Sequence, residues 1–437
     1  MKVNIPYGKK FLDFEYQPGQ FDILSTQETK PLENINAKII DSLYSPIILN
    51  PLDSFVSRKD KIGIILSDAT RYTAADKIIP VLLEELIKAD VKPKNIAFII
   101  SAGMHRQPTE TEINTIIGQP AASQFPVYIH NAYDESMFYY LGTTSQDTPL
   151  YINKKVFDFD KLFIISSIGY HYFAGFSGGR KSLIPGLASI NTIMANHKLV
   201  INRKTGEKNP GARIANLKDN PVHLDLMEGI SKINIPIFCV NAILFEKKLI
   251  DIICGDLDFS FRAACKKYES IASVPIQHKY DIVIASSGGY PKDINVIQAH
   301  KSLEHASYFC KKGGVIIFIA HCPDGWGNKD FADWLKFKDL DTFRRYLLEN
   351  YKVNGQTAYS WRLKAEQFTI IMISSLPLNY QKRLKVLLVR NLERAYAAAL
   401  SRLSPSFQGA IIPFAWELIP EGGGQVFTSS QVTANVL

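Results

Sequence analysis

Short apolar runs alternate with segments of helical periodicity along the first half of the chain. The runs at 62–66, 96–100 and 162–165 contain no polar residue, which predicts strands buried on both faces. Apolar residues recur at helical spacing in 76–88, between the first two runs, and in 190–199, after the third. Buried strands separated by helices predict a mostly parallel sheet that is covered by helices.

The same alternation restarts after Pro275. It predicts strands at 281–285, 314–319 and 368–373, with a long helix at 295–309 between the first two of them. These elements predict a second α/β unit that has its own sheet.

The length of the chain also favours two domains. The chain has 437 residues, whereas a single hydrophobic core rarely grows beyond about 250–300 residues. We therefore predict two α/β domains, residues 1–273 and 274–405, with mostly parallel sheets covered by helices and the active site in the cleft between them. Residues 406–437 are expected to form a C-terminal segment that could pack back on the N-terminal domain, with an exposed tail from Glu421 onward.

Composition and charge exclude several classes of protein. Hydrophobic residues make up 46% and charged residues 21% of the chain, a globular rather than a disordered balance. The net charge is +8, but the basic residues are scattered in isolated pairs such as Lys9–Lys10 and do not cluster with aromatic residues. This pattern argues against nucleic-acid binding, although a mild positive field would attract a carboxylate substrate.

Targeting and cysteine patterns point to a reducing, aqueous compartment. The first residues show no apolar signal region, and no apolar run approaches the roughly 20 residues of a membrane helix. The five cysteines are odd in number and form no CxxC pair, which argues against a disulfide framework and a thiolate zinc site. We expect a cytoplasmic protein without membrane or nucleic-acid partners.

Polar and ionisable residues follow four of the predicted strands. In open α/β sheets, ligands bind outside the carboxyl ends of the strands, so these four segments predict one site. A helix after the last of these strands adds Gln298 and Lys301. The four segments are 67–71, 101–106, 169–181 and 288–293.

The third of these segments is rich in glycine. Gly175, Gly178 and Gly179 allow a tight loop whose backbone N–H groups can approach an anion, and Ser177 adds a hydroxyl donor. The spacing matches neither of the usual nucleotide-binding glycine motifs, and this argues against a dehydrogenase that uses a free dinucleotide. A phosphate-binding loop and a plain structural turn both remain open.

Three histidines are candidates for chemistry. His197 ends a predicted helix, where it could be a favourable cation near the helix dipole or a metal ligand. His105 and His171 follow neighbouring strands, and each could be satisfied structurally by a carbonyl group. As a pair they suit the two acid/base groups of a racemase, which meets each enantiomer from the opposite side, or a two-histidine metal site.

Several motifs together resemble nickel-dependent lactate racemases. The run His171–Gly186, HYFAGFSGGRKSLIPG, followed by Thr192–Ile193 and Asn196–His197, is similar to the signature of that family. Further matches keep their order along the chain: Asp68–Arg71, Gly103–Arg106, Gln298–Lys301 and Trp361. One departure is Tyr72, which stands where the family has a proline, so that lactate and other 2-hydroxy acids both remain open as substrates.

The resemblance implies a cofactor and a role for each matching residue. The cofactor would be a pyridinium-3-thioamide-5-thiocarboxylate mononucleotide, a nickel-pincer nucleotide, attached at Lys181, with His197 as a nickel ligand. His105 and His171 would be catalytic. The cofactor-binding residues would further include Asp68, Gly175, Ser177, Gly178 and Gly179, and the substrate-binding residues would be Arg71, Gln298, Lys301 and Trp361.

The resemblance also implies the reaction. It predicts an isomerase that inverts C2 of a small 2-hydroxy acid by reversible hydride transfer to the cofactor, through a 2-keto acid. Separate cofactor-synthesis proteins would be its partners. The alternative is a nickel or cofactor carrier without racemase activity, which would use Lys181 and His197 only.

Overall fold

The chain is described by a computed structural model that covers residues 1–422 and divides into two compact units. The central unit consists of Glu28–His197 and Leu217–Ser270. The terminal unit consists of Met1–Gln27, Lys198–Asn216 and the chain from Ile271 onward. The exposed tail expected beyond Glu421 lies, from residue 423, outside the described residues.

The central unit is built on a mostly parallel sheet. The strand order is β12-β11-β9-β4-β5-β6; β12 is antiparallel to β11, and a short strand, β10, is antiparallel to β9. These strands are β4 (Ile62–Ser67), β5 (Ile96–Ser101), β6 (Val127–Ile129), β9 (Lys161–His171), β10 (Gly175–Ser177), β11 (Ile237–Phe245) and β12 (Lys248–Gly255).

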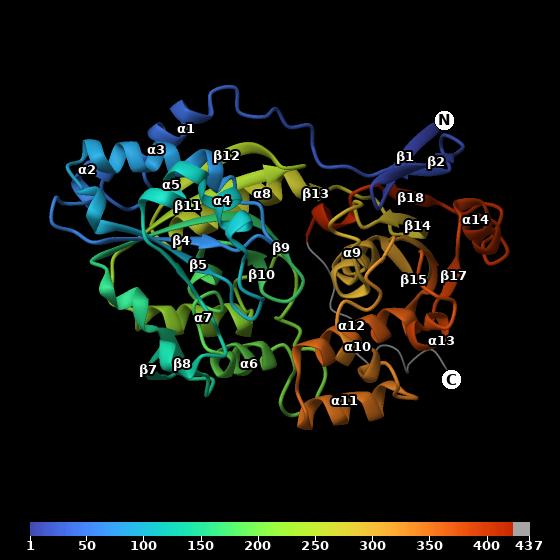
Figure 1. Cartoon of the computed structure of the whole chain (residues 1–437). Helices are drawn as coiled ribbons and strands as arrows, with labels where there is room; N and C mark the ends of the chain where they lie inside the picture. The colour runs from blue at the N-terminus through green and yellow to red at the C-terminus, as the bar shows by residue number, and fades with distance from the viewer. Residues whose placement is uncertain (423–437) are drawn as a thin grey trace. The chain divides into compact units, whose positions relative to one another are not determined.

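Helices cover both faces of this sheet. Figure 1 shows α1 and α3 on one side and α6 and α7 on the other. The helices of the unit are α1 (Ile35–Tyr44), α2 (Leu52–Phe55), α3 (Ala75–Lys88), α4 (Glu110–Ile117), α5 (Gln119–Gln124), α6 (Ile190–Lys198), α7 (Pro221–Ser231) and α8 (Phe259–Ala272). A separate hairpin consists of β7 (Phe138–Thr143) and β8 (Pro149–Asn153).

The terminal unit has a second, fully parallel sheet. Its order is β17-β16-β15-β14-β18-β3. The strands are β3 (Phe21–Ile23), β14 (Tyr280–Ser286), β15 (Cys310–Ile319), β16 (Thr369–Ile373), β17 (Leu387–Val389) and β18 (Gly409–Ile412), and short pairs are formed by β1 (Lys2–Tyr7) with β2 (Lys10–Glu15) and by β13 (Ser273–Val274) with β19 (Ile419–Pro420).

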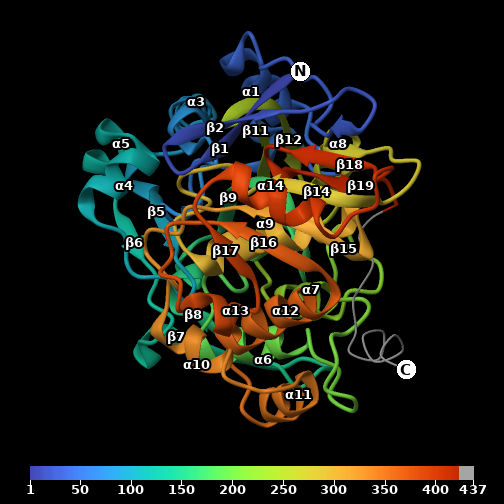
Figure 2. The same cartoon turned by 90° about the vertical axis from the view of Figure 1, so that its right-hand side faces the viewer.

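Apolar cores lie on both faces of the terminal sheet. Residues of α9 and α12 pack on one face, and residues of α14 and the β1–β2 hairpin pack on the other. In Figure 1 and Figure 2, α10, α11 and α12 gather at the same end of the unit. The helices are α9 (Val296–Phe309), α10 (Lys329–Trp334), α11 (Leu340–Glu349), α12 (Val353–Gln367), α13 (Tyr380–Leu384) and α14 (Leu392–Leu400). The predicted α/β class with two mostly parallel sheets is confirmed.

The units differ from the predicted division into 1–273 and 274–405. Residues 1–27 join the terminal unit because β3 pairs with β18, an interaction between opposite ends of the chain. Residues 198–216 also join it, where Lys208 forms a buried ion pair with Glu304 of α9. Since β18 lies between β14 and β3, the segment after residue 405 is part of the terminal sheet and not a segment added to the N-terminal domain.

The secondary structure otherwise follows the hydrophobic pattern closely. Each predicted strand and helix is present, and two strands are clearly longer than predicted: β15 begins at Cys310 instead of residue 314, and β9 is extended at its end. β9 continues to His171, beyond its predicted end near Ser166, because β10 pairs with residues 169–171 and satisfies their backbone groups. Within residues 1–422, no helix combines the length and the apolar character that a membrane crossing requires.

Buried histidines make the stability of the fold depend on pH, and His130 and His305 are two of them. The pKa of His130, whose Nε2 lies 3.1 Å from the Ala188 carbonyl, and that of His305, whose Nδ1 lies 2.9 Å from the Leu418 carbonyl, are both lowered by burial to about 4. The folded chain therefore keeps them neutral while the unfolded chain takes up protons, so stability falls as the pH drops from about 6.5 towards 4.

We expect the free energy of unfolding to fall by about 1.4 kcal/mol per pH unit for each of these histidines within that window. Urea unfolding near neutral pH and near pH 5 measures the difference. His130→Gln, which removes one buried titrating group, should weaken the pH dependence. A pH dependence unchanged by this substitution would show that His130 does not contribute.

Candidate active site

Hydrogen bonds tie together three loops at one edge of the central sheet. Because β4, β5 and β9 are parallel neighbours, their carboxyl ends lie at the same edge. Ser101 Oγ at the end of β5 donates to the Leu66 carbonyl of β4 at 2.8 Å. Gly103 N–H donates to the Gly186 carbonyl at 3.0 Å, which joins the loop of His105 to the segment that holds Lys181. Three of the four predicted loops therefore meet, and the fourth, 288–293, belongs to the terminal unit.

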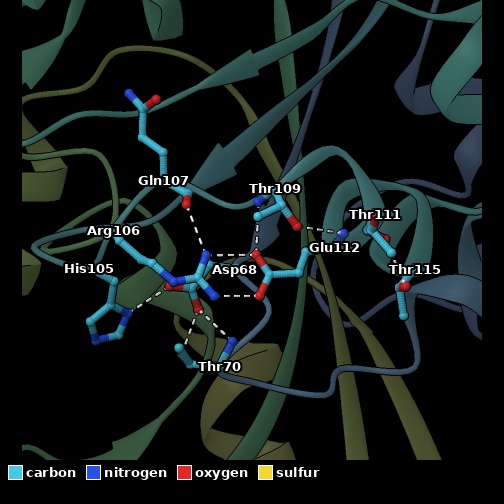
Figure 3. A network of polar contacts seen from close by, with 9 residues as sticks. All are labelled: Asp68, Thr70, His105, Arg106, Gln107, Thr109, Thr111, Glu112 and Thr115. Atoms are coloured by element: carbon cyan, nitrogen blue, oxygen red, sulfur yellow. Dashed lines mark hydrogen bonds and ion pairs between the residues drawn. The ribbon is translucent and has the colours of Figure 1, made fainter. Parts of the chain in front are cut away.

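Asp68 and His105 form a carboxylate–imidazole pair (Figure 3). His105 Nδ1 lies 2.6 Å from Asp68 Oδ2, and Asp68 Oδ1 accepts hydrogen bonds from the backbone N–H and the hydroxyl of Thr70, at 3.2 and 2.6 Å. Asp68 is only 5% exposed, whereas about half of the His105 side chain is accessible. The carboxylate thus holds the ring by one nitrogen, while Nε2 points away from it.

The carboxylate of this pair is ionised. Burial alone would raise the pKa of Asp68, but the hydrogen bonds from His105 and Thr70 and the charges of His105 and Arg71 hold it below its ordinary value. The sequence predicts that Asp68 binds the cofactor. It did not predict the contact of Asp68 with His105 that the structure shows. The adjacency of a loop aspartate and a loop histidine on neighbouring strands was the available signal.

The chain on either side of the pair is also fixed. After His105, Arg106 binds the Glu112 carboxylate with two nitrogens, and Glu112 in turn accepts from the Thr109 N–H at the start of α4 (Figure 3). After Asp68, Arg71 is exposed, and so is Tyr72, at 40%. A guanidinium can form a bidentate contact with a carboxylate ligand.

The glycine-rich segment forms a tight hairpin with β9. Gly178 and Gly179 have φ values of 85° and 50°, and side chains there would meet the Ser167 carbonyl at 2.6 Å and the Phe261 ring at 2.8 Å. Gly179 N–H donates to Ser166 Oγ at 2.7 Å, and Ser177 Oγ donates to the Gly169 carbonyl at 3.2 Å. Close packing alone therefore requires these glycines, and these two donors are already used within the chain.

Arg180 supports the hairpin from inside. It is fully buried; its Nη2 donates to the carbonyls of Ala174 and Phe176, at 2.8 and 3.2 Å, and its guanidinium stacks 4.3 Å from the centre of the Phe261 ring. Burial lowers the pKa of Arg180 to about 10, so it remains a cation at neutral pH. Its role here is to hold the turn that precedes Lys181.

The Phe173 ring brings three predicted site residues together. The ring centres of His171 and His197 lie 4.5 and 5.1 Å from that of Phe173, both in edge-on geometry. Lys181 Nζ lies 5.6 Å from the same ring centre. Phe173 is 2% exposed, so this group has a rigid apolar centre. The sequence signature contains Phe173, but nothing in its spacing indicates this position.

The two histidines of this group have defined protonation. His171 Nδ1 accepts a hydrogen bond from Ala174 N–H at 3.2 Å, which places the proton of the neutral ring on Nε2. The pKa of His197 is lowered to about 3 by burial and by the charge of Lys181, against the opposing effect of the Ile193 carbonyl. His197 is therefore neutral and does not stabilise the end of α6 as a cation. The neutral imidazole is also the form that binds metals. No group of three or more His, Cys, Asp or Glu arranged for a metal is found in residues 1–422.

The remaining predicted residues belong to the terminal unit. Gln298 and Lys301 lie together on α9, where Lys301 Nζ donates to Gln298 Oε1 at 2.8 Å. Trp361, also predicted to bind the substrate, lies on α12. It is 0% exposed, its indole N–H donates to the Leu384 carbonyl at 2.9 Å, and its ring packs against Phe318. Trp361 is therefore a core residue of this unit.

Comparison with known proteins identifies the family. Residues 7–208 match the family model for the lactate racemase N-terminal domain, and residues 276–416 match that for the lactate racemase C-terminal domain. The chain belongs to the lactate racemase family. As a member of this family it is an isomerase.

Individual relatives agree with this assignment. The lactate racemase of Thermoanaerobacterium thermosaccharolyticum is 34% identical over 76% of this chain and 78% of its own length. That of Lactiplantibacillus plantarum is 32% identical over 79% of this chain and 80% of its own. The structure of the lactate racemase apoprotein from T. thermosaccharolyticum matches with a TM-score of 0.87 at 29% identity, over 96% of this chain and 100% of that one. A Thermotoga maritima protein, 18% identical with a TM-score of 0.66 over 88% of this chain and 97% of its own, shares the fold.

Proposed function

We propose that this chain is a racemase or epimerase that inverts C2 of a small 2-hydroxy acid, either lactate or a related compound. The observation that carries this proposal is the grouping of His171, His197 and Lys181 around Phe173, at the sheet edge that also holds the Asp68–His105 pair. Two histidines poised for proton transfer, beside an amine and a neutral imidazole, suit a reaction that must treat two mirror-image substrates alike.

The residues of this group fit a nickel-pincer nucleotide attached at Lys181. A covalent attachment needs an amine, and Lys181 Nζ lies in a buried position beside Phe173. A group that brings its own sulfur and carbon donors needs only one ligand from the chain. His197, held neutral, offers an imidazole nitrogen, which suits nickel. Separate cofactor-synthesis proteins would have to supply this group.

When bound, such a group supplies reversible acceptance of a hydride from C2. The residues of the chain then handle the substrate's proton and its carboxylate. Either His105 or His171 takes the 2-hydroxyl proton as the hydride leaves C2. Once the hydride has returned to the opposite face of C2, the other histidine returns a proton to the keto oxygen. Asp68 stabilises His105 when the ring becomes charged. We propose Arg71, Gln298 and Lys301 as the residues that bind the substrate carboxylate and hydroxyl.

The test uses protein produced together with the cofactor-synthesis proteins. It is incubated with single enantiomers of several 2-hydroxy acids, and chiral chromatography follows the opposite enantiomer. We expect inversion of at least one compound, with an α-deuterium label retained on carbon because the hydrogen moves as hydride. Protein produced without the synthesis proteins is the control. Release of the label into water would contradict hydride transfer, and full cofactor loading without any inversion would favour a carrier.

A further inference from the structure

Helix α7 contributes no residue to the proposed chemistry. Hydrogen bonds nevertheless join it to Phe173 and to the residue before His197, two parts of the group formed by His171, His197 and Lys181 around Phe173. Its N-cap, Asn220, is fully buried. Asn220 Oδ1 accepts from the backbone N–H groups of Val222 and His223, and this begins the helix. Asn220 Nδ2 donates to the Phe173 carbonyl at 2.8 Å. The start of α7 is therefore bonded to the residue whose ring contacts His171, His197 and Lys181.

A second contact lies further along the same helix. Asp225 is 2% exposed and accepts three side-chain hydrogen bonds. The donors are Thr144 Oγ1 at 2.5 Å, Thr148 Oγ1 at 2.9 Å and Asn196 Nδ2 at 2.8 Å. Asn196 Nδ2 also donates to the Val222 carbonyl, at 3.1 Å. The residue directly before His197 is thus bonded twice to α7.

These bonds fix the direction in which His197 points. Consecutive side chains of an α-helix are about 100° apart around its axis, so clamping Asn196 sets the rotation of α6 at His197. The clamp is strong because the acceptor is a buried carboxylate and all of its donors come from the same unit. Asn220 thus holds the backbone of Phe173, and Asp225 holds the side chain of Asn196, the residue before His197.

We propose that Asp225, acting through Asn196, is a positioning residue for His197 as a nickel ligand, and that Asn220 positions Phe173 in the same way. This inference rests on the proposed function, because it takes nickel as the ion that His197 binds. It predicts that loss of the Asp225–Asn196 contact loosens nickel while the organic part of the cofactor stays attached at Lys181, on a different segment of the chain.

The experiment measures nickel and the Lys181 adduct separately in the loaded holoenzyme. Nickel per chain after dialysis against a chelator is measured by elemental analysis, and the adduct by intact mass. We expect Asp225→Ala and Asn196→Ala to weaken nickel retention by about tenfold or more, the usual loss when a group that orients a metal ligand is removed, with the adduct unchanged. The double variant should lose less than the sum of the two single variants, since the Asp225–Asn196 contact is common to both.

Two variants provide controls. Glu228→Ala alters a carboxylate of the same helix that binds Ser145, in the loop of Thr144 and Thr148, but does not contact Asn196. It should retain nickel. Asp225→Asn keeps the size of the side chain and one acceptor oxygen, and should restore part of the nickel retention.

The outcomes separate this inference from the proposed function. Normal nickel retention by both Asp225→Ala and Asn196→Ala, or an equal loss in Glu228→Ala, would overturn the positioning role. If Asp225→Ala fails to fold, Asn196→Ala removes the same contact from the side of α6 and decides the question. A wild-type protein that carries nickel and adduct but inverts no substrate would refute the proposed function, whereas the nickel comparison among the variants would still hold.

Discussion

Replacing His105 or His171 with alanine should lower the rate of inversion by about 10²–10⁴-fold in both directions, the usual contribution of one general acid or base. Each turnover needs one group to take the hydroxyl proton and another to return it, and these groups exchange roles when the other enantiomer reacts. Neither direction can therefore bypass one histidine. In the structure, His105 Nδ1 lies 2.6 Å from Asp68 Oδ2, and His171 Nδ1 accepts a hydrogen bond from Ala174 N–H.

The measurement is the initial rate from each pure enantiomer, with the Lys181 adduct quantified in every variant. His278→Ala, which removes an exposed histidine of the terminal unit, is the matched control and should keep its rate. Asp68→Asn preserves the shape that holds His105 but removes the charge that stabilises its protonated form, so we expect a smaller loss than for His105→Ala. A near-normal rate in either direction for a fully loaded His171→Ala protein would contradict the two-base assignment.

Local sequence patterns were sufficient to predict the elements of the fold. Apolar runs such as 62–66 and 314–319 favour strands that are covered on both faces, and both appear as central parallel strands. The division of the chain was less predictable. The pairing of β3 with β18 and the insertion of 198–216 depend on contacts between distant residues, which periodicity does not record.

The candidate site shows the same limit. Its location at the carboxyl ends of β4, β5 and β9 follows from a general property of parallel sheets, so the loops could be predicted together. The partners within the site could not. The Asp68–His105 bond and the central position of Phe173 are three-dimensional facts, and Trp361 matched a motif although it is buried in a core. A motif residue and a site residue are distinguished only by what surrounds the side chain.

Removing the carboxylate of Glu304 should destabilise the terminal unit by about 3–5 kcal/mol, because it leaves buried cations without their counter-charge. Glu304 is 1% exposed and forms ion pairs with two buried lysines, Lys208 at 3.0 Å and Lys364, while Tyr308 and Ser360 donate to its oxygens. Burial alone would raise the pKa of Glu304, but the two lysines hold it well below its usual range. Burial lowers the pKa of Lys364 to about 8 despite its carboxylate partner.

Glu304→Gln keeps the shape of the side chain and removes only the charge, so urea unfolding of this variant measures the electrostatic loss. Glu304, Lys208 and Lys364 together carry one excess positive charge, and Glu304→Gln raises this excess to two. Adding Lys364→Met returns it to one and should recover part of the stability. Glu366→Gln is the control: its partly exposed carboxylate lies on α12, the helix of Lys364, and binds Arg362 and the exposed Lys385, so its loss should cost less than that of the buried Glu304. If Glu304→Gln unfolds like the wild type, the lysines must already be neutral or hydrated in the folded chain. Because Lys208 joins residues 198–216 to α9, the same substitution should loosen this segment first, which would appear as increased amide exchange there.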